Sequence, residues 1–229
     1  WVQTRTRNGQ KQVRLQPLDK YRKLFESPGT FRLIHAEEIS DGHAGKPIHM
    51  NAVNLKEMIE PQGGSSVRDV MRNNLQAVRK QAEKHDQPIL VHVNHPNFHW
   101  AISAEDLAQV VEERFVEVYN GHPHVNTMGD ANHPSDEEKW DIANTIRLTE
   151  LNAKPLFGLA TDDSHQYHGG NNPPGRGWIM VRAQALTPEA LIAAMRKGDF
   201  YASSGVALDN VTFNAEDDTL QIKIDAKEG

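Results

Sequence analysis

The sequence predicts a parallel α/β fold, and three observations support this class. Short apolar runs of strand character alternate with segments of helical periodicity along most of the chain. Three of the helical segments open with a recognisable capping residue. The 229 residues suffice for one large domain, or for a domain with a small appendage, and the 38% hydrophobic and 24% charged fractions are those of an ordinary globular protein.

The N-terminal part is the least regular. Residues 1–20 are polar and lack clear periodicity, so we expect a loop or an arm there. A short helix is predicted over Tyr21–Glu26, because the Ser27-Pro28-Gly29 segment that follows is a typical helix end. Phe31–Ile39 and Pro47–Leu55 then read as two strands, separated by a loop that contains two glycines.

The middle of the chain alternates most clearly between the two patterns. A long helix is predicted over Ser66–Lys84, because its apolar side chains recur near helical spacing. The strand Ile89–Val93 follows, and Ser103 caps a shorter helix. After a strand over Phe115–Tyr119, the sequence Ser135-Asp-Glu-Glu is a capping box that opens a helix running to about residue 151.

The alternation continues to about residue 205 and then breaks. Leu156–Ala160 and Trp178–Val181 read as strands on either side of a loop rich in glycine, asparagine and proline. Thr187-Pro188-Glu189 begins a helix that Gly198 ends. Val211–Phe213 and Leu220–Ile224 flank a polar turn and predict a β-hairpin, so we assign residues 1–208 to the main domain and 209–229 to the start of a small β module.

Composition and motifs exclude several classes of function. The net charge of −6 and the lack of a basic cluster disfavour binding to nucleic acid. No apolar run approaches bilayer length, so we expect a soluble protein without a membrane partner, and a chain without cysteine suits the bacterial cytoplasm and periplasm alike. The sequence contains no Walker loop, dinucleotide-binding glycine motif, His-Glu-x-x-His or Gly-x-Ser-x-Gly.

Metal-ligand residue types recur at the ends of four predicted strands. Since thiolates are absent, a metal here must be held by imidazoles and carboxylates, which suits zinc, manganese or iron. In α/β barrels the loops at the C-terminal ends of the strands form the active site, so such groups would converge. His92 lies inside a strand, where core packing or support of a ligand is the preferred interpretation, and His122 and His124 remain ambiguous. The residues at the four strand ends are Glu37 and Glu38, His49, His95, and Asp162, Asp163 and His165.

Four segments resemble the PHP superfamily of metal-dependent phosphoesterases, named for polymerase and histidinol phosphatase. The resemblance spans about residues 31–208 and is carried by Leu33–Ser40, Ile48–Asn54, Val91–Asn97 and Ala160–His165. It implies a distorted seven-stranded (β/α) barrel with a site for two or three metal ions. The family's opening His-x-His and Asp-His motifs do not occur before Glu38, so we expect the chain to begin just past them, with an N-terminally incomplete barrel and impaired catalysis.

The resemblance also implies a set of metal ligands. Glu38, favoured over Glu37 by its place in the motif, would bridge two ions, with His49 and His95 completing the first site. Asp163 would bind the second ion, and His165 a third ion or the substrate.

Three further segments resemble the carbaryl-hydrolase-like branch, whose members include phosphoesterases and hydrolases of carbamates or other esters. These segments are Val116–Gly121, Gly175–Val181 and Gly198–Gly205. Within them, Asn120 and Arg176 are the candidate substrate-binding residues, although Arg176 equally fits an exposed arginine in a flexible loop. Asp162 and His92 are candidates for supporting the ligands by hydrogen bonds.

We therefore expect a metal-dependent hydrolase, most simply a phosphoesterase that uses a metal-bridged hydroxide on a small-molecule ester. Two alternatives remain open. The same site would serve a carbamate or carboxylic-ester hydrolase, and a degenerate site would leave a non-catalytic binding module.

Overall fold

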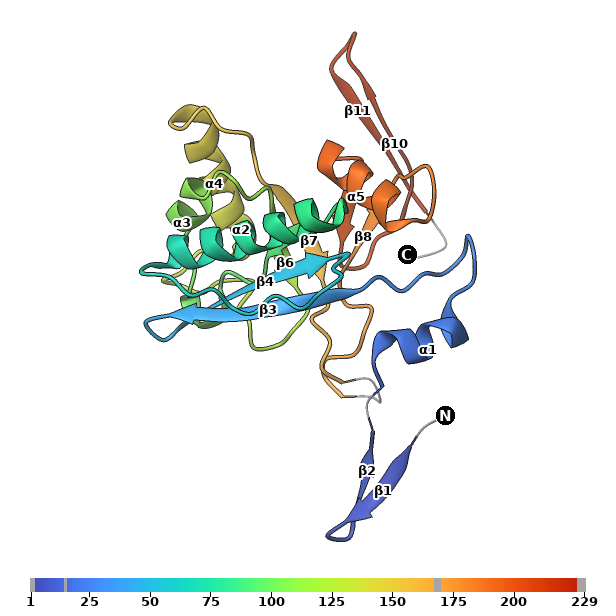
Figure 1. The fold of residues 1–229 in the computed structure, drawn as a ribbon. Coiled ribbons are helices and arrows are strands. Elements are labelled where there is room, and N and C mark those ends of the chain that lie inside the picture. The colour runs from blue at the N-terminus through green and yellow to red at the C-terminus, as the bar shows by residue number, and fades with distance from the viewer. Residues whose placement is uncertain (1–2, 15, 167–169, 226–229) are drawn as a thin grey trace.

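The fold is built around one open, mixed β-sheet (Figure 1). The computed structural model describes residues 3–14, 16–166 and 170–225, and these ranges contain five α-helices and eleven β-strands. The central sheet has the strand order β3-β4-β5-β6-β7. Its strands are β3 (Ala36–His43), β4 (Lys46–Val53), β5 (Leu90–Val93), β6 (Phe115–Asn120) and β7 (Phe157–Thr161).

The prediction of a parallel sheet was wrong for half of this sheet. Strand β4 runs antiparallel to both β3 and β5, and only the pairs β5–β6 and β6–β7 are parallel. The β3–β4 pair is antiparallel because Ala44 and Gly45 alone make the turn between the two strands, with φ of +50° and +80°. A two-residue turn with positive φ at both positions makes a hairpin, whereas a parallel pair needs a longer crossover.

The predicted (β/α)7 barrel was also wrong, because no closed barrel forms within the described ranges. Closure requires the first and last strands of a sheet to pair, and here β3 and β7 remain opposite edges. Strand β8 (Trp178–Val181) does not extend the parallel sheet beside β7. It pairs antiparallel with β9 (Phe200–Ser203), a strand that the sequence analysis did not predict.

The N-terminal segment forms a hairpin where a loop or arm was expected. Strands β1 (Thr4–Arg7) and β2 (Gln10–Val13) pair around Asn8-Gly9, whose φ values are +51° and +75°. Asn-Gly is the strongest short hairpin signal, but the polar residues on either side lack the apolar alternation that marks a strand. Residues 1, 2 and 15 of this segment lie outside the described residues. Helix α1 (Leu18–Phe25) follows, and β3 begins at Ala36, five residues later than predicted.

The four helices that follow α1 begin close to where the sequence predicts them. Ser66 caps α2 (Val67–His85), Ser103 caps α3 (Ala104–Gln109) and Ser135 caps α4 (Asp136–Thr149), the last two through complete capping boxes. Thr187 caps α5 (Pro188–Lys197), and Gly198 ends it with φ of +84°. Helix α2 lies across β3 and β4, and α3 packs beside α4 (Figure 1).

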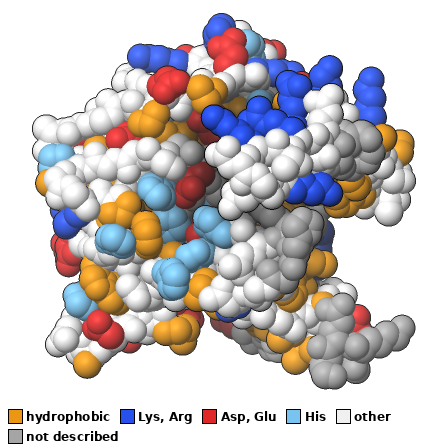
Figure 2. All heavy atoms as spheres, turned by 90° about the horizontal axis from the view of Figure 1, so that it is seen from below, with side chains coloured by type: hydrophobic (Ala, Val, Ile, Leu, Met, Phe, Trp, Pro, Cys, Tyr) orange, Lys and Arg blue, Asp and Glu red, His pale blue; other side chains and the backbone are white. Residues whose placement is uncertain are grey.

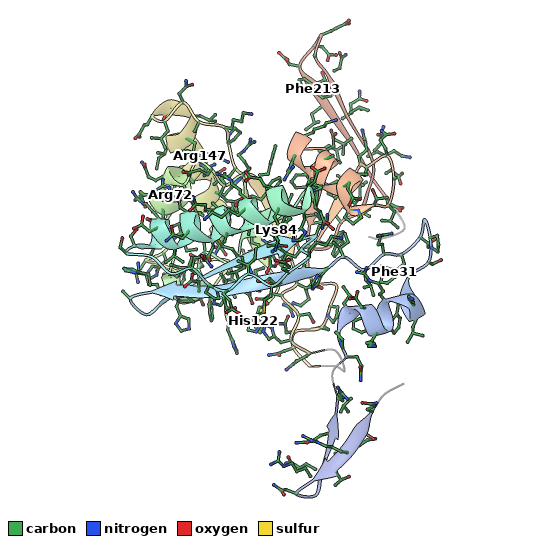
Figure 3. The ribbon with its side chains drawn as sticks, viewed as in Figure 1. Phe31, Arg72, Lys84, His122, Arg147 and Phe213 are labelled. Atoms are coloured by element: carbon green, nitrogen blue, oxygen red, sulfur yellow. The ribbon has the colours of Figure 1, made fainter. Side chains whose placement is uncertain are left out.

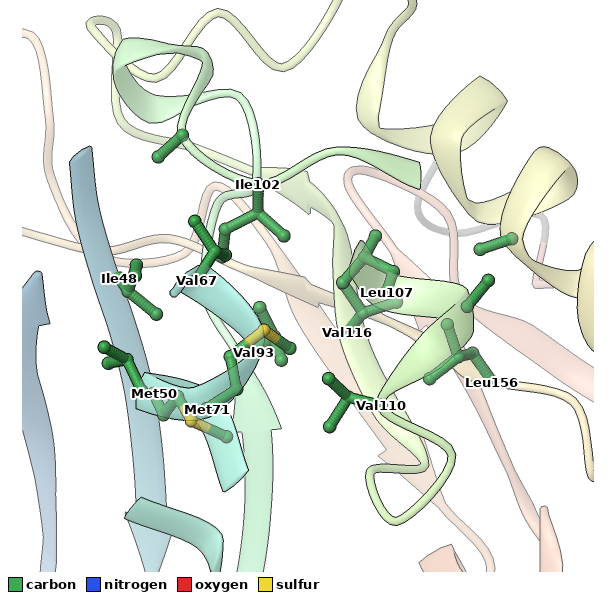
Figure 4. Close-up of a cluster of buried hydrophobic side chains, with 14 of the residues drawn as sticks. Ile48, Met50, Val67, Met71, Val93, Ile102, Leu107, Val110, Val116 and Leu156 are labelled. Atoms are coloured by element: carbon green, nitrogen blue, oxygen red, sulfur yellow. The ribbon is translucent and has the colours of Figure 1, made fainter. Parts of the chain in front are cut away.

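Side-chain alternation divides β4 between the core and the opposite face of the sheet. Ile48, Met50 and Ala52 are fully buried, and the first two pack with Val70 and Met71 of α2 in the main core cluster (Figure 4). His49 and Asn51 alternate with them and are only partly buried, so they emerge on the face away from α2. The candidate site lies on this second face.

A buried arginine joins α3 to α4. Arg147, which has no exposed surface, donates from Nη2 to the carbonyl oxygens of Leu107 and Val110 at 2.6 and 2.7 Å, and from Nη1 to that of Glu113 at 2.8 Å (Figure 3). The carbonyl groups at the end of α3 have no partner within the helix, so Arg147 supplies their hydrogen bonds.

The C-terminal hairpin forms as predicted, from β10 (Leu208–Asn214) and β11 (Thr219–Ile224), and it projects away from the sheet (Figure 1). The assignment of residues 209–229 to a separate module stays a prediction, and its last four residues lie outside the described ranges. No helix in the described part of the chain has both the length and the apolar character needed to span a bilayer.

Candidate metal site

Three of the predicted ligands meet on the face of the sheet opposite α2. Glu38 Oε1 lies 3.0 Å from His49 Nδ1 and 3.3 Å from His95 Nε2. One ligand atom from each of the three residues lies within 4.8 Å of the other two, and no other group of three does so in the part of the chain that the structure describes. We call Glu38, His49 and His95 the triad.

The register of the sheet explains how Glu38 and His49 meet. Glu38 pairs with Asn51 and Ser40 pairs with His49, so all four side chains share one face. Glu38 and His49 are diagonal neighbours across this antiparallel pair, a separation that long side chains bridge. Both residues lie inside their strands, so the expectation that they end barrel strands was wrong while their proximity was anticipated.

The third member of the triad, His95, comes from the segment that follows β5. Its backbone has φ of +23°, outside the range that non-glycine residues usually adopt. Its imidazole is buried, with 6% of the side chain exposed. The Phe98 ring packs against both imidazoles, with centroid distances of 5.2 Å to His95 and 6.0 Å to His49. This segment therefore turns His95 back over β4.

Asn94 fixes the carboxylate of the triad. Its Nδ2 donates to Glu38 Oε1 at 3.0 Å and to Asn51 Oδ1 at 3.1 Å, while its Oδ1 accepts the backbone N–H of Asn51 at 3.1 Å. Asn94 itself is buried, with 4% of its surface exposed. Neither Asn94 nor its role was predicted.

The charges of the triad are coupled. Hydrogen bonds from His49 and His95, with a smaller contribution from Asn94, hold the pKa of Glu38 far below its usual range despite partial burial. Burial by itself would lower the pKa of His95, but the hydrogen bond to Glu38 and the nearby acidic groups Glu117 and Asp163 raise it overall. Glu38 is therefore an ionised carboxylate, and positive charge beside it stabilises that ionised form.

The donor set fits a divalent transition metal. One carboxylate and two imidazoles are ligands that zinc, manganese and iron accept, and three protein ligands leave coordination positions open. Glu37, the rejected alternative, points elsewhere, because its Oε1 accepts the backbone N–H of Ile59 at 3.0 Å. The preference for Glu38 over Glu37 therefore agrees with the local geometry.

The remaining predicted ligands form a second cluster with the two ambiguous histidines. His165 Nδ1 lies 2.8 Å from the carbonyl oxygen of Asp163 and 3.7 Å from its carboxylate. The His165 ring contacts that of His122 at 4.7 Å, and His122 contacts His124 at 5.2 Å. Figure 2 shows several histidine side chains gathered around acidic groups on this face, and Figure 3 shows His122 below the sheet.

The candidate substrate-binding residues contact protein groups in this structure. Asn120 is buried, its amide donating to Glu117 and to Asp163. The Arg176 guanidinium donates from Nη1 to the carbonyl oxygen of Asn171 at 2.7 Å, within its own loop. Arg176 also lies against Gly121, because a Cβ placed on that glycine would be 2.7 Å from the Cβ of Arg176.

Asp162 and His92, the two candidates for supporting the ligands, contact different parts of the structure. Asp162 accepts the backbone N–H of Gly175, so it shapes the glycine-rich loop that carries Arg176. His92 is buried beside Glu117, with 3.7 Å between its Nδ1 and Glu117 Oε1, and burial lowers the pKa of its imidazole. Their roles at a metal stay predictions.

No protein-family model and no curated protein matches the chain. The resemblance to the PHP superfamily therefore rests on the sequence segments quoted above, and membership in that family stays a prediction.

Proposed function

We propose that Glu38, His49 and His95 bind a divalent metal ion, and that the protein is a metal-dependent hydrolase acting on small-molecule phosphate esters. One observation carries the proposal. A carboxylate and two imidazoles from three successive strand segments approach within 4.8 Å on one face of the sheet, where the described residues offer Glu38 no lysine or arginine. A bound cation would replace the shared protons between these groups.

The chemistry follows from the residues around the triad. A divalent ion held there would lower the pKa of a bound water and polarise an ester oxygen. His165 Nδ1 donates to the Asp163 carbonyl, which leaves Nε2 of the neutral ring unprotonated and able to accept a proton or bind an ion. Asn94 keeps Glu38 in place while charge changes beside it.

The second cluster and the loop that carries Arg176 favour an anionic ester. His122, His165 and Arg176 present imidazole and guanidinium groups, which suit phosphate oxygens better than an apolar acyl group. The apolar contact near the triad comes from Phe98, whose ring lies against both histidines. Because an apolar ring can pack against an uncharged ester, carbamate or carboxylic esters are the second substrate class for the same site.

Substitution of Glu38 tests the metal site. We expect Glu38→Gln to weaken Zn²⁺ and Mn²⁺ binding at least tenfold, because it removes the one negative ligand of the triad, and removal of a supporting residue alone costs about 10- to 100-fold. Glu37→Gln is the matched control. Glu37 is the next residue in the strand but points toward Ile59, and the glutamine oxygen can still accept the backbone N–H of Ile59. Titration calorimetry on both variants and the parent, with elemental analysis, measures the difference.

Equal affinity in the parent and in Glu38→Gln would refute the site. If the site holds, metal-loaded protein is assayed on p-nitrophenyl phosphate, p-nitrophenyl acetate and p-nitrophenyl N-methylcarbamate. Hydrolysis of the phosphate ester that disappears in Glu38→Gln supports the proposal, and preference for either other substrate assigns the second class. Tight metal binding without hydrolysis of any ester would identify a non-catalytic module.

A further inference from the structure

A carboxyl group occupies a core position in the middle of the sheet. Glu117 lies within β6 between Val116 and Val118, which pack in the main core cluster, and only 1% of its surface is exposed. Placing a carboxyl group in such a position costs several kcal/mol unless hydrogen bonds compensate. An apolar residue would be expected here, so the contacts of Glu117 need an explanation.

The first contact of Glu117 is with the backbone of a triad residue. Glu117 Oε2 accepts the N–H of His95 at 2.8 Å, in a fully buried hydrogen bond. His95 has a positive φ of 23°, and a non-glycine residue held in a sparsely populated conformation costs about 1–3 kcal/mol. The hydrogen bond that the His95 N–H donates to Glu117 therefore stabilises the backbone geometry that directs His95 toward Glu38.

The second contact leads to the other cluster. The same Oε2 accepts Asn120 Nδ2 at 2.9 Å, and that amide nitrogen also lies 3.3 Å from Asp163 Oδ2. Asn120 Oδ1 accepts the backbone N–H of His122 at 2.8 Å. One carboxyl oxygen thus connects the backbone of His95 with the asparagine that holds Asp163 and the His122 loop.

We propose that Glu117 is a positioning residue, which holds the backbone of His95 and, through Asn120, sets Asp163 relative to the triad. This inference rests on the proposed metal site for its functional meaning. It explains why a carboxyl group is retained in the core, and it assigns the Glu117–Asn120 pair to the alignment of the two clusters. Glu117 does not itself reach the reacting atoms.

Cobalt binding tests the effect on the site. Co²⁺ is added to the parent protein and to Glu117→Ala and Glu117→Gln, and both affinity and the visible absorption spectrum are recorded. We expect Glu117→Ala to weaken binding about tenfold and to change the spectrum, because His95 is no longer held in place. Glu117→Gln keeps one oxygen to accept the His95 N–H, so it should recover most of the parent spectrum.

A second buried glutamate provides the matched control. Glu113 is 3% exposed and its Oε1 accepts the backbone N–H groups of Arg114 and Phe115, both at 2.7 Å, at the start of the same strand. Glu113→Gln should leave cobalt affinity and spectrum unchanged, whatever it does to stability. An equal change in cobalt affinity and spectrum in Glu117→Ala and Glu113→Gln would mean that Glu117 acts through general stability. That result would overturn the proposal.

Hydrogen exchange of the His95 amide in metal-free protein separates this inference from the proposed function. We expect exchange at His95 to be at least tenfold faster in Glu117→Ala than in Glu113→Gln, after both are corrected for global unfolding. Parent-like exchange at His95 would overturn the positioning role. If the parent binds no cobalt, the metal site fails while the exchange result still decides whether Glu117 holds His95.

Discussion

Replacing Arg147 with alanine is expected to lower the free energy of unfolding by about 3–5 kcal/mol, because it leaves buried groups without partners. The guanidinium supplies hydrogen bonds to three buried carbonyl groups, those of Leu107, Val110 and Glu113. Burial lowers the pKa of Arg147 to about 10, so the group is still charged at neutral pH. Alanine would remove the donors and leave a cavity between α3 and α4 as well.

Urea denaturation of the parent and the variant measures this loss. Arg68→Ala is the control, since Arg68 likewise bonds to α3, through the Asp106 carboxylate at 2.7 Å, but its side chain is 39% exposed. An exposed pair of this kind contributes about 1 kcal/mol or less. Comparable losses in the two variants would contradict the view that Arg147 holds the end of α3.

Asp136→Asn is expected to stabilise the protein at pH 8 and to have little effect near pH 4. Asp136 is 1% exposed, and burial raises its pKa from 3.8 to about 8, despite Lys139 nearby and a hydrogen bond from the backbone of Asn97. Its Oδ2 and Asn97 Oδ1 are both buried without a hydrogen-bond partner. An asparagine keeps the shape of the side chain and removes the cost of the buried charge.

The sign follows from proton binding. Between pH 4 and 8 the folded protein binds a proton at Asp136 that the unfolded chain has released, so this group's contribution to stability falls as pH rises, with a limiting slope of about 1.4 kcal/mol per pH unit. The gain in the variant should therefore grow across this window, to the order of 5 kcal/mol at pH 8. Thermal denaturation at several pH values checks it. A gain that is the same at pH 4 and pH 8 would show that charge is not the cause.

Local signals in the sequence predicted the helices well and the sheet poorly. Ser103, Ser135 and Thr187 each cap the helix assigned to them, because capping depends on three or four adjacent residues, and apolar spacing located α2. Strand direction depends on connections, and the short turn at Ala44-Gly45 was read as a loop between parallel strands. The barrel prediction failed for that reason and because β8 pairs with β9.

The candidate site was predictable where chemistry restricts residue type. A metal in a chain without cysteine requires histidine and carboxylate ligands. The resemblance to the PHP superfamily selected Glu38, His49 and His95 among them, and the structure brings these three together. Asn94 and Glu117 could not be predicted as site residues, because the sequence does not reveal which polar residues in or beside a buried strand face a site. The one available signal for Glu117 was its position between two valines in an otherwise apolar strand.

The tight turn between β3 and β4 has a consequence for how the triad assembles during folding. The hairpin brings Glu38 and His49 together from residues only eleven apart, whereas His95 lies 57 residues beyond Glu38 and joins when β5 docks. If the pairing of β3 with β4 slipped by one residue, Glu38 would turn to the α2 face. A neighbouring residue of β3 would then take its place on the site face. A metal ion that needs all three donors would therefore bind only the correctly registered, fully docked sheet, and would select it over every misaligned form.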